Sequence, residues 1–336
     1  MKKVLFATTA LVATAGVAAA DVTFGGYGRF GVLYNDTVTN AGPDAAFGTA
    51  DDFTESDTSV TSRFRLQIDA TTESDAGVTF GARVRIQQDN DGSADGTTVG
   101  GAAVDANGDG IADFRGRQET GINGVRFFAR SGGFEVGVGN IFGAIEFMPG
   151  QYPIDLGLTG LGYDYTAYNF NADLYDSDAN GAAGQNGVEV MYSAGDFSAH
   201  LSASDTNSRV AAYVSYAFGD WTVALGGQDS DAAGDTELTA SVGGSLGAAD
   251  VTLAYADNGT NGTRLVLAGR VDVGASTNIE AYIANRDDIT IPAGEEDTSY
   301  GVDFNMDMGG GTSLRGGVAS RFNGSTIADL GVRFNF

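Results

Sequence analysis

The chain lacks residue types that many functional sites require. Its 336 residues include no cysteine and one histidine. Without cysteine the protein has no disulfides, thiolate metal sites or cysteine nucleophiles. The single histidine, His200, leaves little room for a histidine-rich metal centre or for histidine general-base catalysis. We therefore expect a protein that is not an enzyme and that requires no cofactor.

Basic side chains are also scarce. Lysine and arginine together number 18 against 44 aspartates and glutamates, which gives a net charge of −26, and the only lysines are Lys2 and Lys3. Nucleic-acid phosphates require a basic surface, so no nucleic-acid partner is expected. A hydrophobic share of 42% is too high for a disordered chain. After Asp21, no apolar run is long enough for a membrane-spanning helix.

The first twenty residues have the layout of a secretory signal peptide. Lys2 and Lys3 provide the positive start, and residues 4–20 are apolar or small. Ala18 and Ala20 form a small-residue cleavage signal ahead of Asp21. A short membrane anchor is the alternative, but the stretch falls short of the ~20 strongly apolar residues that a span needs. We expect a signal peptide over residues 1–20 and an exported domain over residues 21–336.

The remaining chain alternates between apolar and polar residues with a period of two, which indicates strands with one apolar face. The last segment is the clearest. The apolar residues Leu330, Val332 and Phe334 alternate there with the polar or small residues Asp329, Gly331, Arg333 and Asn335. Most runs have roughly the 9–12 residues of a tilted membrane-spanning strand. Sixteen such runs begin near Val22, Ser59, Gly77, Asn123, Gly133, Gly187, Phe197, Val210, Trp221, Glu237, Asp250, Thr263, Thr277, Ser299, Thr312 and Thr326.

The connections alternate between short and long. Short ones include Ser74–Ala76, Ser131–Gly132, Gly219–Asp220 and Gly309–Gly311. Long acidic ones cover roughly Asp36–Asp57, Asp89–Glu119, Met148–Gln185 and Arg286–Thr298. This pattern predicts an all-β fold, a transmembrane antiparallel β-barrel of sixteen strands. Closure leaves no unpaired strand edge, which a bilayer requires. The alternatives are a secreted β-sandwich and a Ca²⁺-rich β-solenoid, although no fixed short repeat supports the solenoid.

The sequence also resembles bacterial general diffusion porins, most nearly the alphaproteobacterial type. The resemblance rests on the leader, the opening segment Asp21–Gly31, the sixteen-run layout and the terminal Phe336. It implies an outer-membrane barrel of a Gram-negative bacterium, usually a homotrimer in contact with lipid and lipopolysaccharide. It further implies that the third long loop folds into the lumen, and that Phe336 is part of the signal read by the barrel assembly machinery.

Arginines recur at alternate positions on neighbouring strands. Arg63 and Arg65 share one strand face, and Arg83 and Arg85 share a face of the next strand. The intervening residues are apolar and would face lipid, so the arginine face must be the lumen. The same basic wall can extend to Arg29, Arg126 and Arg130. The alternative is that these arginines form ordinary salt bridges between strands.

The segment from Met148 to Phe170 is expected to oppose this wall. It carries Asp155 and Asp164, with Glu146 just before it. Two prolines stiffen the segment, and its glycines let it fold tightly (Pro149, Pro153, Gly150, Gly157, Gly160 and Gly162). The family resemblance implies that this segment narrows the channel. A basic wall facing an acidic loop would create a transverse field that favours small polar solutes.

A second acidic segment matches a calcium loop. Asp105, Asn107, Asp109 and Asp113 place oxygen ligands at positions 1, 3, 5 and 9. Gly116 stands where the pattern requires a bidentate glutamate, and the flanks show no helical pattern. We expect a structural Ca²⁺ on the outer rim, against the alternative of a solvated acidic loop.

Two short motifs of enzymes do not fit their context. The Gly26-x-Gly28-x-x-Gly31 spacing matches a dinucleotide fingerprint but lies within a strand pattern. Ser245 matches a hydrolase nucleophile elbow, but the hydrolase order requires a histidine after the serine and His200 precedes it. The sequence thus predicts no catalytic residues.

The function expected is passive diffusion of small hydrophilic solutes and ions through a water-filled channel, with a weak preference for cations. A substrate-specific channel should show an aromatic ladder along the polar strand faces, and no such ladder is evident. Two alternatives remain. One is a non-conducting barrel that anchors an adhesin or serves a structural role, and the other is a secreted acidic β protein that binds Ca²⁺.

Overall fold

The computed structural model describes residues 21–40, 53–90, 121–170, 187–231, 234–287, 289–291 and 294–336. The predicted signal peptide and the predicted calcium ligands Asp105, Asn107, Asp109 and Asp113 lie outside these residues. The described part contains sixteen strands and two short 3₁₀ helices, η1 (Thr206–Ser208) and η2 (Gly259–Asn261). Within these ranges no helix is long and apolar enough to cross a membrane.

The strands follow one another along the chain without an intervening α-helix in the described residues. Their bounds are β1 Asp21–Asn40, β2 Phe53–Glu73, β3 Thr79–Asn90, β4 Gly121–Ser131, β5 Phe134–Gly139, β6 Gly187–Ala194, β7 Phe197–Ser204, β8 Arg209–Phe218, β9 Trp221–Asp229, β10 Glu237–Leu246, β11 Ala249–Asp257, β12 Thr263–Asp272, β13 Thr277–Asp287, β14 Thr298–Gly309, β15 Thr312–Ser320 and β16 Thr326–Asn335.

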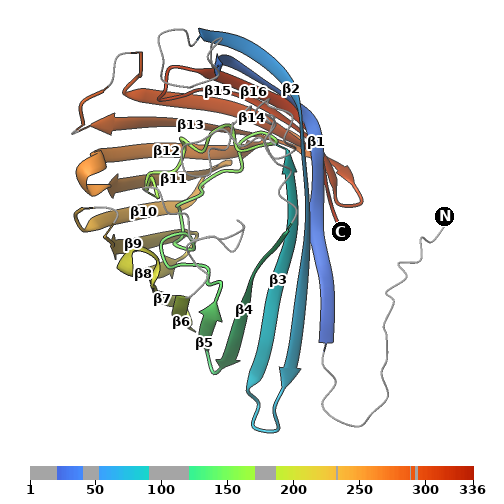
Figure 1. Ribbon diagram of the computed structural model, residues 1–336, viewed down its shortest axis with the longest axis vertical. Helices are drawn as coiled ribbons and strands as arrows, with labels where there is room; N and C mark the ends of the chain where they lie inside the picture. Colours follow the sequence, from blue (N-terminus) through green and yellow to red (C-terminus); the bar gives the residue numbers. More distant parts are fainter. Residues whose placement is uncertain are drawn as a thin grey trace, which may run out of the picture.

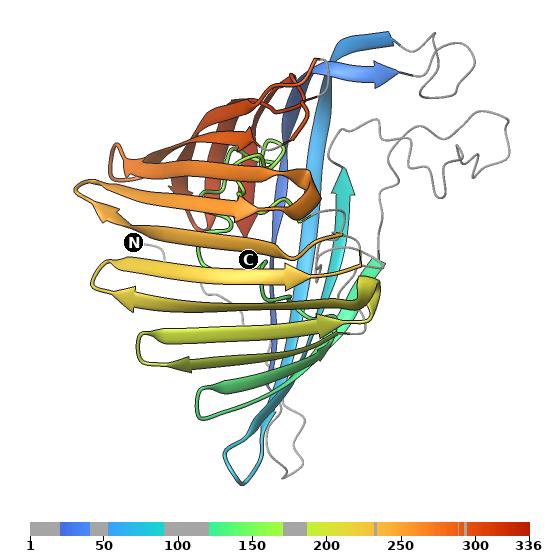
Figure 2. The same cartoon turned by 90° about the vertical axis from the view of Figure 1, so that its left-hand side faces the viewer.

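The strands form a closed antiparallel barrel, as the alternating pattern predicts. Each strand pairs with its neighbours in sequence, and β1 pairs with β16 to close the sheet. Short turns, among them those that join β6 to β7, β8 to β9, β10 to β11 and β12 to β13, lie at one rim (Figure 2). The terminal residue takes part in closure, because Phe336 N donates to Gly26 O at 3.1 Å and Gly26 N donates to Phe336 O at 3.0 Å. All sixteen strands therefore have partners on both sides.

Alternation along each strand sorts side chains to the two faces of the barrel. On β16, Leu330 and Phe334 are exposed on the outer face, whereas Asp329 is buried on the inner face. On β11, Leu253 and Tyr255 are exposed, whereas Ala254 is buried. The outer face is apolar, which suits lipid, and the inner face carries small and polar residues, so the pattern is that of a membrane barrel.

The predicted strand starts lie close to the observed ones except for β2. That strand was expected to begin near Ser59, but it begins at Phe53, and β1 continues to Asn40. Pairing resumes beyond an irregularity between Asn35 and Val38 and continues to the end of β1. Backbone pairing requires no alternation of side chains, so this extension left no period-two signal. The expected connection Asp36–Asp57 is correspondingly shorter.

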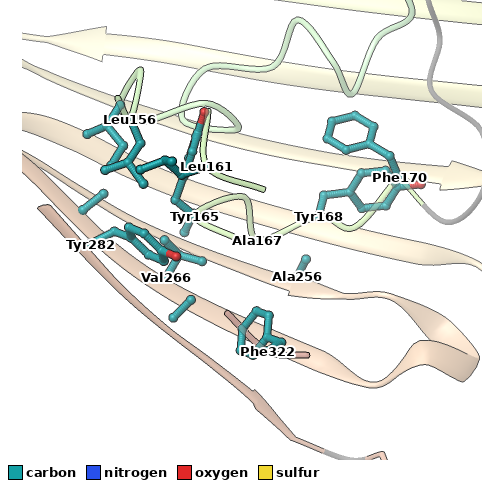
Figure 3. Close-up of a cluster of buried hydrophobic side chains, with 14 of the residues drawn as sticks. Leu156, Leu161, Tyr165, Ala167, Tyr168, Phe170, Ala256, Val266, Tyr282 and Phe322 are labelled. Carbon is teal, nitrogen blue, oxygen red and sulfur yellow. The ribbon is translucent and has the colours of Figure 1, made fainter. Parts of the chain in front are cut away.

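The chain that follows β5 lies inside the barrel (Figure 1). Its described residues, 140–170, supply most of the buried apolar side chains of the described part of the chain. We call these residues the inner segment. Its Leu156, Leu161 and Tyr165 pack in one cluster with Val266 and Tyr282 of the barrel wall (Figure 3). The wall residues beneath the cluster are mostly small, namely Ala211, Ala254, Ala256, Ala268, Ala284 and Ala319. Small side chains leave room for a chain segment against the inner face of the sheet.

Candidate functional site

Three carboxylates of the inner wall hold the middle of the inner segment. They belong to Glu280 of β13, Asp303 of β14 and Asp329 of β16, and all three are buried. The register places Glu280 opposite Asp303, and Gly317 opposite both Asp303 and Asp329. The bonds are Asp155 N to Glu280 Oε2 (2.9 Å), Gly157 N to Asp303 Oδ2 (2.6 Å), Leu158 N to Asp329 Oδ1 (3.0 Å) and Thr159 N to Asp329 Oδ2 (2.7 Å). One row of carboxylates thus satisfies four of the backbone donors between Asp155 and Thr159 that a buried loop would otherwise leave unpaired.

The seam where β1 meets β16 is shaped to receive Leu158. Gly31 and Gly331 face each other across this seam. A Cβ atom on Gly31 would lie 2.7 Å from Leu158 Cδ2, which is closer than side chains pack. Arg29 NH1 donates to Leu158 O at 2.7 Å. The paired glycines and Arg29 therefore fix the position of the inner segment at the seam.

Glu189 of β6 anchors the beginning of the inner segment. Its Oε2 accepts Phe142 N at 3.1 Å and Gly143 N at 3.3 Å. Its Oε1 accepts Arg126 Nε at 2.6 Å, and His200 Nε2 lies 2.9 Å from Oε2. Glu189 and His200 have side chains with no solvent exposure. His200, which the sequence left without a catalytic role, belongs to this buried anchor.

Four glycines give the inner segment its tight path. Gly150, Gly157, Gly160 and Gly162 have φ values of 84°, 64°, 90° and 88°. These angles fall in the left-handed region that only glycine adopts without a steric cost. The expectation that these glycines allow tight folding agrees with the backbone.

The predicted arginine wall divides into pairs with polar partners. Arg65 lies opposite Gln87 and donates to its Oε1 at 2.6 Å. Arg83 lies opposite Asp69 and forms an ion pair at 2.6 Å. Arg85 Nε donates to Gln67 Oε1 at 2.9 Å. The arginines of β2 and β3 share the inner face, but a carboxylate or amide partner stands directly across from each of these three.

Other predicted wall residues have different surroundings. Arg29 lies opposite both Arg63 and Arg333, so three guanidinium groups share one row over β2, β1 and β16. Arg126 is enclosed, because it pairs with Glu189 and Glu135 and its side chain is 3% exposed. For Arg126 the ordinary ion-pair interpretation describes the geometry.

Arg130 lies towards the short-turn rim. Its Nε is 3.2 Å from Glu135 Oε2, and its side chain is 50% exposed. It is thus the more accessible of the two predicted wall arginines on β4.

The predicted acidic residues of the inner segment are held at separate places on the wall. Asp155 pairs with Arg315 of β15 and with Arg333 of β16, the latter at 3.1 Å. Asp164 is buried and accepts Phe322 N at 2.9 Å. Glu146 instead interacts electrostatically with the buried Arg209 of β8. The structure therefore does not bring Glu146, Asp155 and Asp164 together as one acidic row.

Arg315 and Arg333 are the site residues that sequence reasoning missed. Both lie on inner strand faces, and Arg333 already stood on the polar side of the alternating last segment. The available signal was their alternate spacing with polar neighbours. Their partner Asp155 is 160 and 178 residues away, so no local pattern could link them.

Among the described residues, no group of three or more histidine, aspartate or glutamate side chains is placed to hold a metal ion. The expected Ca²⁺ ligands lie outside those residues.

Comparison with known proteins gives one consistent result. A family model described as Gram-negative porin matches residues 7–326. A porin from Fuscovulum blasticum is 32% identical over 230 residues, covering 64% of this chain and 77% of that protein. A porin from Rhodobacter capsulatus is 30% identical over 257 residues, covering 65% and 82% respectively. The solved structure of a Rhodopseudomonas blastica porin triple mutant matches with 27% identity and a TM-score of 0.68, covering 94% of this chain and all of that one.

Proposed function

The chain belongs to the Gram-negative porin family, and from this premise we propose that it forms a water-filled outer-membrane channel for passive diffusion of small hydrophilic solutes and ions. The observation that carries the proposal is the closed barrel with its inner segment fixed to one side of the wall. Hydrogen bonds attach that segment to strands between β6 and β16 and to Arg29 of β1, while β2 and β3 carry arginines on their inner faces.

The constriction lies between the inner segment and the arginines of β2 and β3. Arg63 and Arg29 are the charged side chains that act most strongly on Tyr163 of the inner segment. Asp155 is the loop carboxylate with an exposed side chain, at 61%. Opposite charges on the two sides of the constriction orient water and favour small polar solutes over apolar ones.

The channel prefers cations weakly. Acidic side chains outnumber basic ones by 44 to 18, and the long connections of one rim are rich in aspartate. Such a rim raises the local cation concentration at the mouth, whereas the arginines of the constriction act in the opposite direction. The test is the reversal potential of the purified protein in a planar bilayer with a tenfold KCl gradient. A potential of the sign set by K⁺ is expected, and a clear anion preference would refute the selectivity.

The assembly and export of the protein follow the family pattern. Residues 1–20 are cleaved as a signal peptide, the barrels associate as a homotrimer, and lipid and lipopolysaccharide surround the outer face. Support comes from the leader and from the exposed apolar side chains of the outer face. N-terminal sequencing of the outer-membrane protein and its mass in detergent test these points, with Asp21 as the first residue and three chains expected.

Phe336 is part of the signal that the barrel assembly machinery reads. It directly follows β16 and is hydrogen-bonded to Gly26 of β1, and its ring stacks on Phe64 with centroids 5.7 Å apart. Deletion of Phe336 should lower the amount of folded barrel in the outer membrane. A variant with Phe64→Leu controls for loss of the ring contact alone.

Asp105, Asn107, Asp109 and Asp113 hold a structural Ca²⁺ at the rim. The support is the ligand spacing in the sequence. Calorimetric titration of chelator-treated protein with CaCl₂ should give one site per chain, and Asp109→Asn should abolish it. Equal heats for both proteins would refute the site.

A further inference from the structure

A cavity beside the inner segment combines aromatic rings with a charge-balanced polar wall. Its volume is about 480 Å³, within the range of small-molecule sites. Residues 152–155 and two further tyrosines of the inner segment form one side, and β11, β12 and β13 form the other. Asp250 and Arg270 lie one and two residues from strand ends at short turns, so the cavity faces the short-turn side of the inner segment.

Tyr152 and Tyr163 give this cavity an aromatic corner. Their rings are 6.4 Å apart between centroids and stand at 87° to each other. The two residues remain 40% and 43% exposed, so part of each ring is accessible. Tyr152 also stacks on Phe170 with centroids 5.8 Å apart, which limits rotation of its ring. The corner is therefore a fixed, half-exposed aromatic surface inside the barrel.

The strand side of the cavity carries a donor between two acceptors. In the strand register Arg270 stands opposite Asp250 on one side and Glu280 on the other, and neighbouring strands lie ~4.8 Å apart. Glu280 is buried and accepts Asp155 N, whereas Asp250 and Arg270 are exposed. Asp250 Oδ1 accepts Ser245 Oγ at 2.7 Å, which orients the carboxylate. An accessible acceptor and an accessible donor therefore stand side by side on this wall.

The charges around the cavity compensate one another. Asp155, the remaining carboxylate of the lining, is paired with Arg315 and Arg333. Beyond the lining, two carboxylates and two guanidinium groups add charges of both signs (Asp272, Asp303, Arg29 and Arg63). An ion of either sign would have to compete with these pairings, whereas a neutral hydroxyl group can accept from a guanidinium and donate to a carboxylate without separating them.

We propose that this cavity binds a neutral sugar, with one C–H face of a pyranose ring on Tyr152 and its hydroxyl groups bridging Asp250 and Arg270. The C–H bonds of that face are slightly positive and meet the negative face of the aromatic ring. Each hydroxyl both donates and accepts, so adjacent hydroxyls donate to Asp250 and accept from Arg270 at the same time. Binding follows from the cavity, whereas a pause of permeating sugars at this site rests on the proposed channel function.

The test is saturation-transfer NMR of the purified protein with methyl β-D-glucopyranoside and with sorbitol, in lauryldimethylamine oxide so that no sugar detergent competes. Sorbitol carries similar hydroxyl groups on an open chain and has no flat C–H face. The glucoside should saturate the protein with a Kd of ~1–10 mM, as expected of a ligand of this size, and sorbitol should bind at least about threefold more weakly. Equal affinities, or no saturable binding of the glucoside, would overturn the proposal.

Variants locate the site. Tyr152→Ala and Asp250→Ala should each weaken glucoside binding about fivefold or more, and Tyr152→Phe should retain it because the ring face remains. Tyr255→Ala is the control for the ring, because Tyr255 is similarly exposed, at 44%, on the outer face of β11. Asp307→Ala is the control for the carboxylate, because Asp307 is exposed near the short turn of β14 and outside the lining. Heat-modifiable gel migration verifies that each variant is folded. Unchanged affinity in both Tyr152→Ala and Asp250→Ala would exclude this cavity as the site.

Planar-bilayer recording separates this inference from the proposed function. The glucoside added on the short-turn side should increase current noise in the wild type and less so in Tyr152→Ala. A conducting channel that does not bind the glucoside contradicts only the binding site. A protein that binds the glucoside but does not conduct contradicts only the channel.

Discussion

Asp329→Ala should release the middle of the inner segment from the barrel wall. The Asp329 carboxylate accepts Leu158 N, Thr159 N and the Thr159 hydroxyl at 2.7–3.0 Å, and the residue is 6% exposed. Hydrogen bonds to a charged group contribute ~1.5–3 kcal/mol each and are not additive, so we take about 3 kcal/mol for the three. At ~1.4 kcal/mol per factor of ten, the population with the segment detached from the seam should rise about a hundredfold.

Two assays report this release. Single-channel recordings of Asp329→Ala should show frequent transitions to higher conductance, because the detached segment no longer holds one position in the lumen. The inner segment contains no lysine or arginine, so chymotrypsin rather than trypsin is the protease to use. Cleavage within residues 140–170 should be faster than in the wild type.

Matched variants define the outcome that would refute this explanation. Asp307 lies on β14 near its short turn to β15, and its carboxylate accepts a hydrogen bond from Gly309 N rather than from the inner segment. Asp307→Asn therefore changes a carboxylate of the same wall that does not hold the inner segment. It should behave as the wild type, and Asp329→Asn should be intermediate because one amide oxygen still accepts a bond. If Asp329→Ala has wild-type current noise and wild-type cleavage rates, the carboxylate row does not hold the segment.

Three further predictions concern separate parts of the lumen. Gly331→Ala should displace Leu158 and strain the β1–β16 pairing, because its Cβ would lie 2.5 Å from Leu158 Cδ2 and 2.3 Å from Phe30 O, so current noise should rise. Gly274→Ala, where a Cβ meets open space, should be silent; equal noise would contradict the seam packing. Glu189→Gln should lower the temperature at which the barrel loses its heat-modifiable migration, because a neutral glutamine pairs more weakly than Glu189 with the buried Arg126. An unchanged temperature would contradict the role of Glu189 as an anchor of the inner segment. Arg65→Gln should shift the KCl reversal potential towards cations, and no shift would place Arg65 off the ion path.

The barrel could be predicted from the sequence because its information is local. Alternation within the last strand placed Leu330 outside and Asp329 inside, and both placements are confirmed. The count of such alternating runs also predicted sixteen strands, as observed. The extension of β1 to Asn40 was missed because pairing there does not require an apolar face.

The path of the inner segment could not be predicted from the sequence. Its fixed points join residues far apart in the chain, such as Leu158 with Asp329, which are separated by 171 positions. The polar face that contains Asp329 was evident, but nothing local identified the backbone N–H groups that it accepts. For the same reason, alternation placed Arg126 on the inner face and gave no sign of the buried ion pair with Glu189.

Single-channel recording of the purified, folded wild-type protein in a planar bilayer tests the central claim most directly. A water-filled channel predicts stepwise current increases whose conductance rises in proportion to the conductivity of the bathing salt. A protein that shows heat-modifiable barrel migration and inserts into the bilayer, but gives no conductance steps, would contradict it.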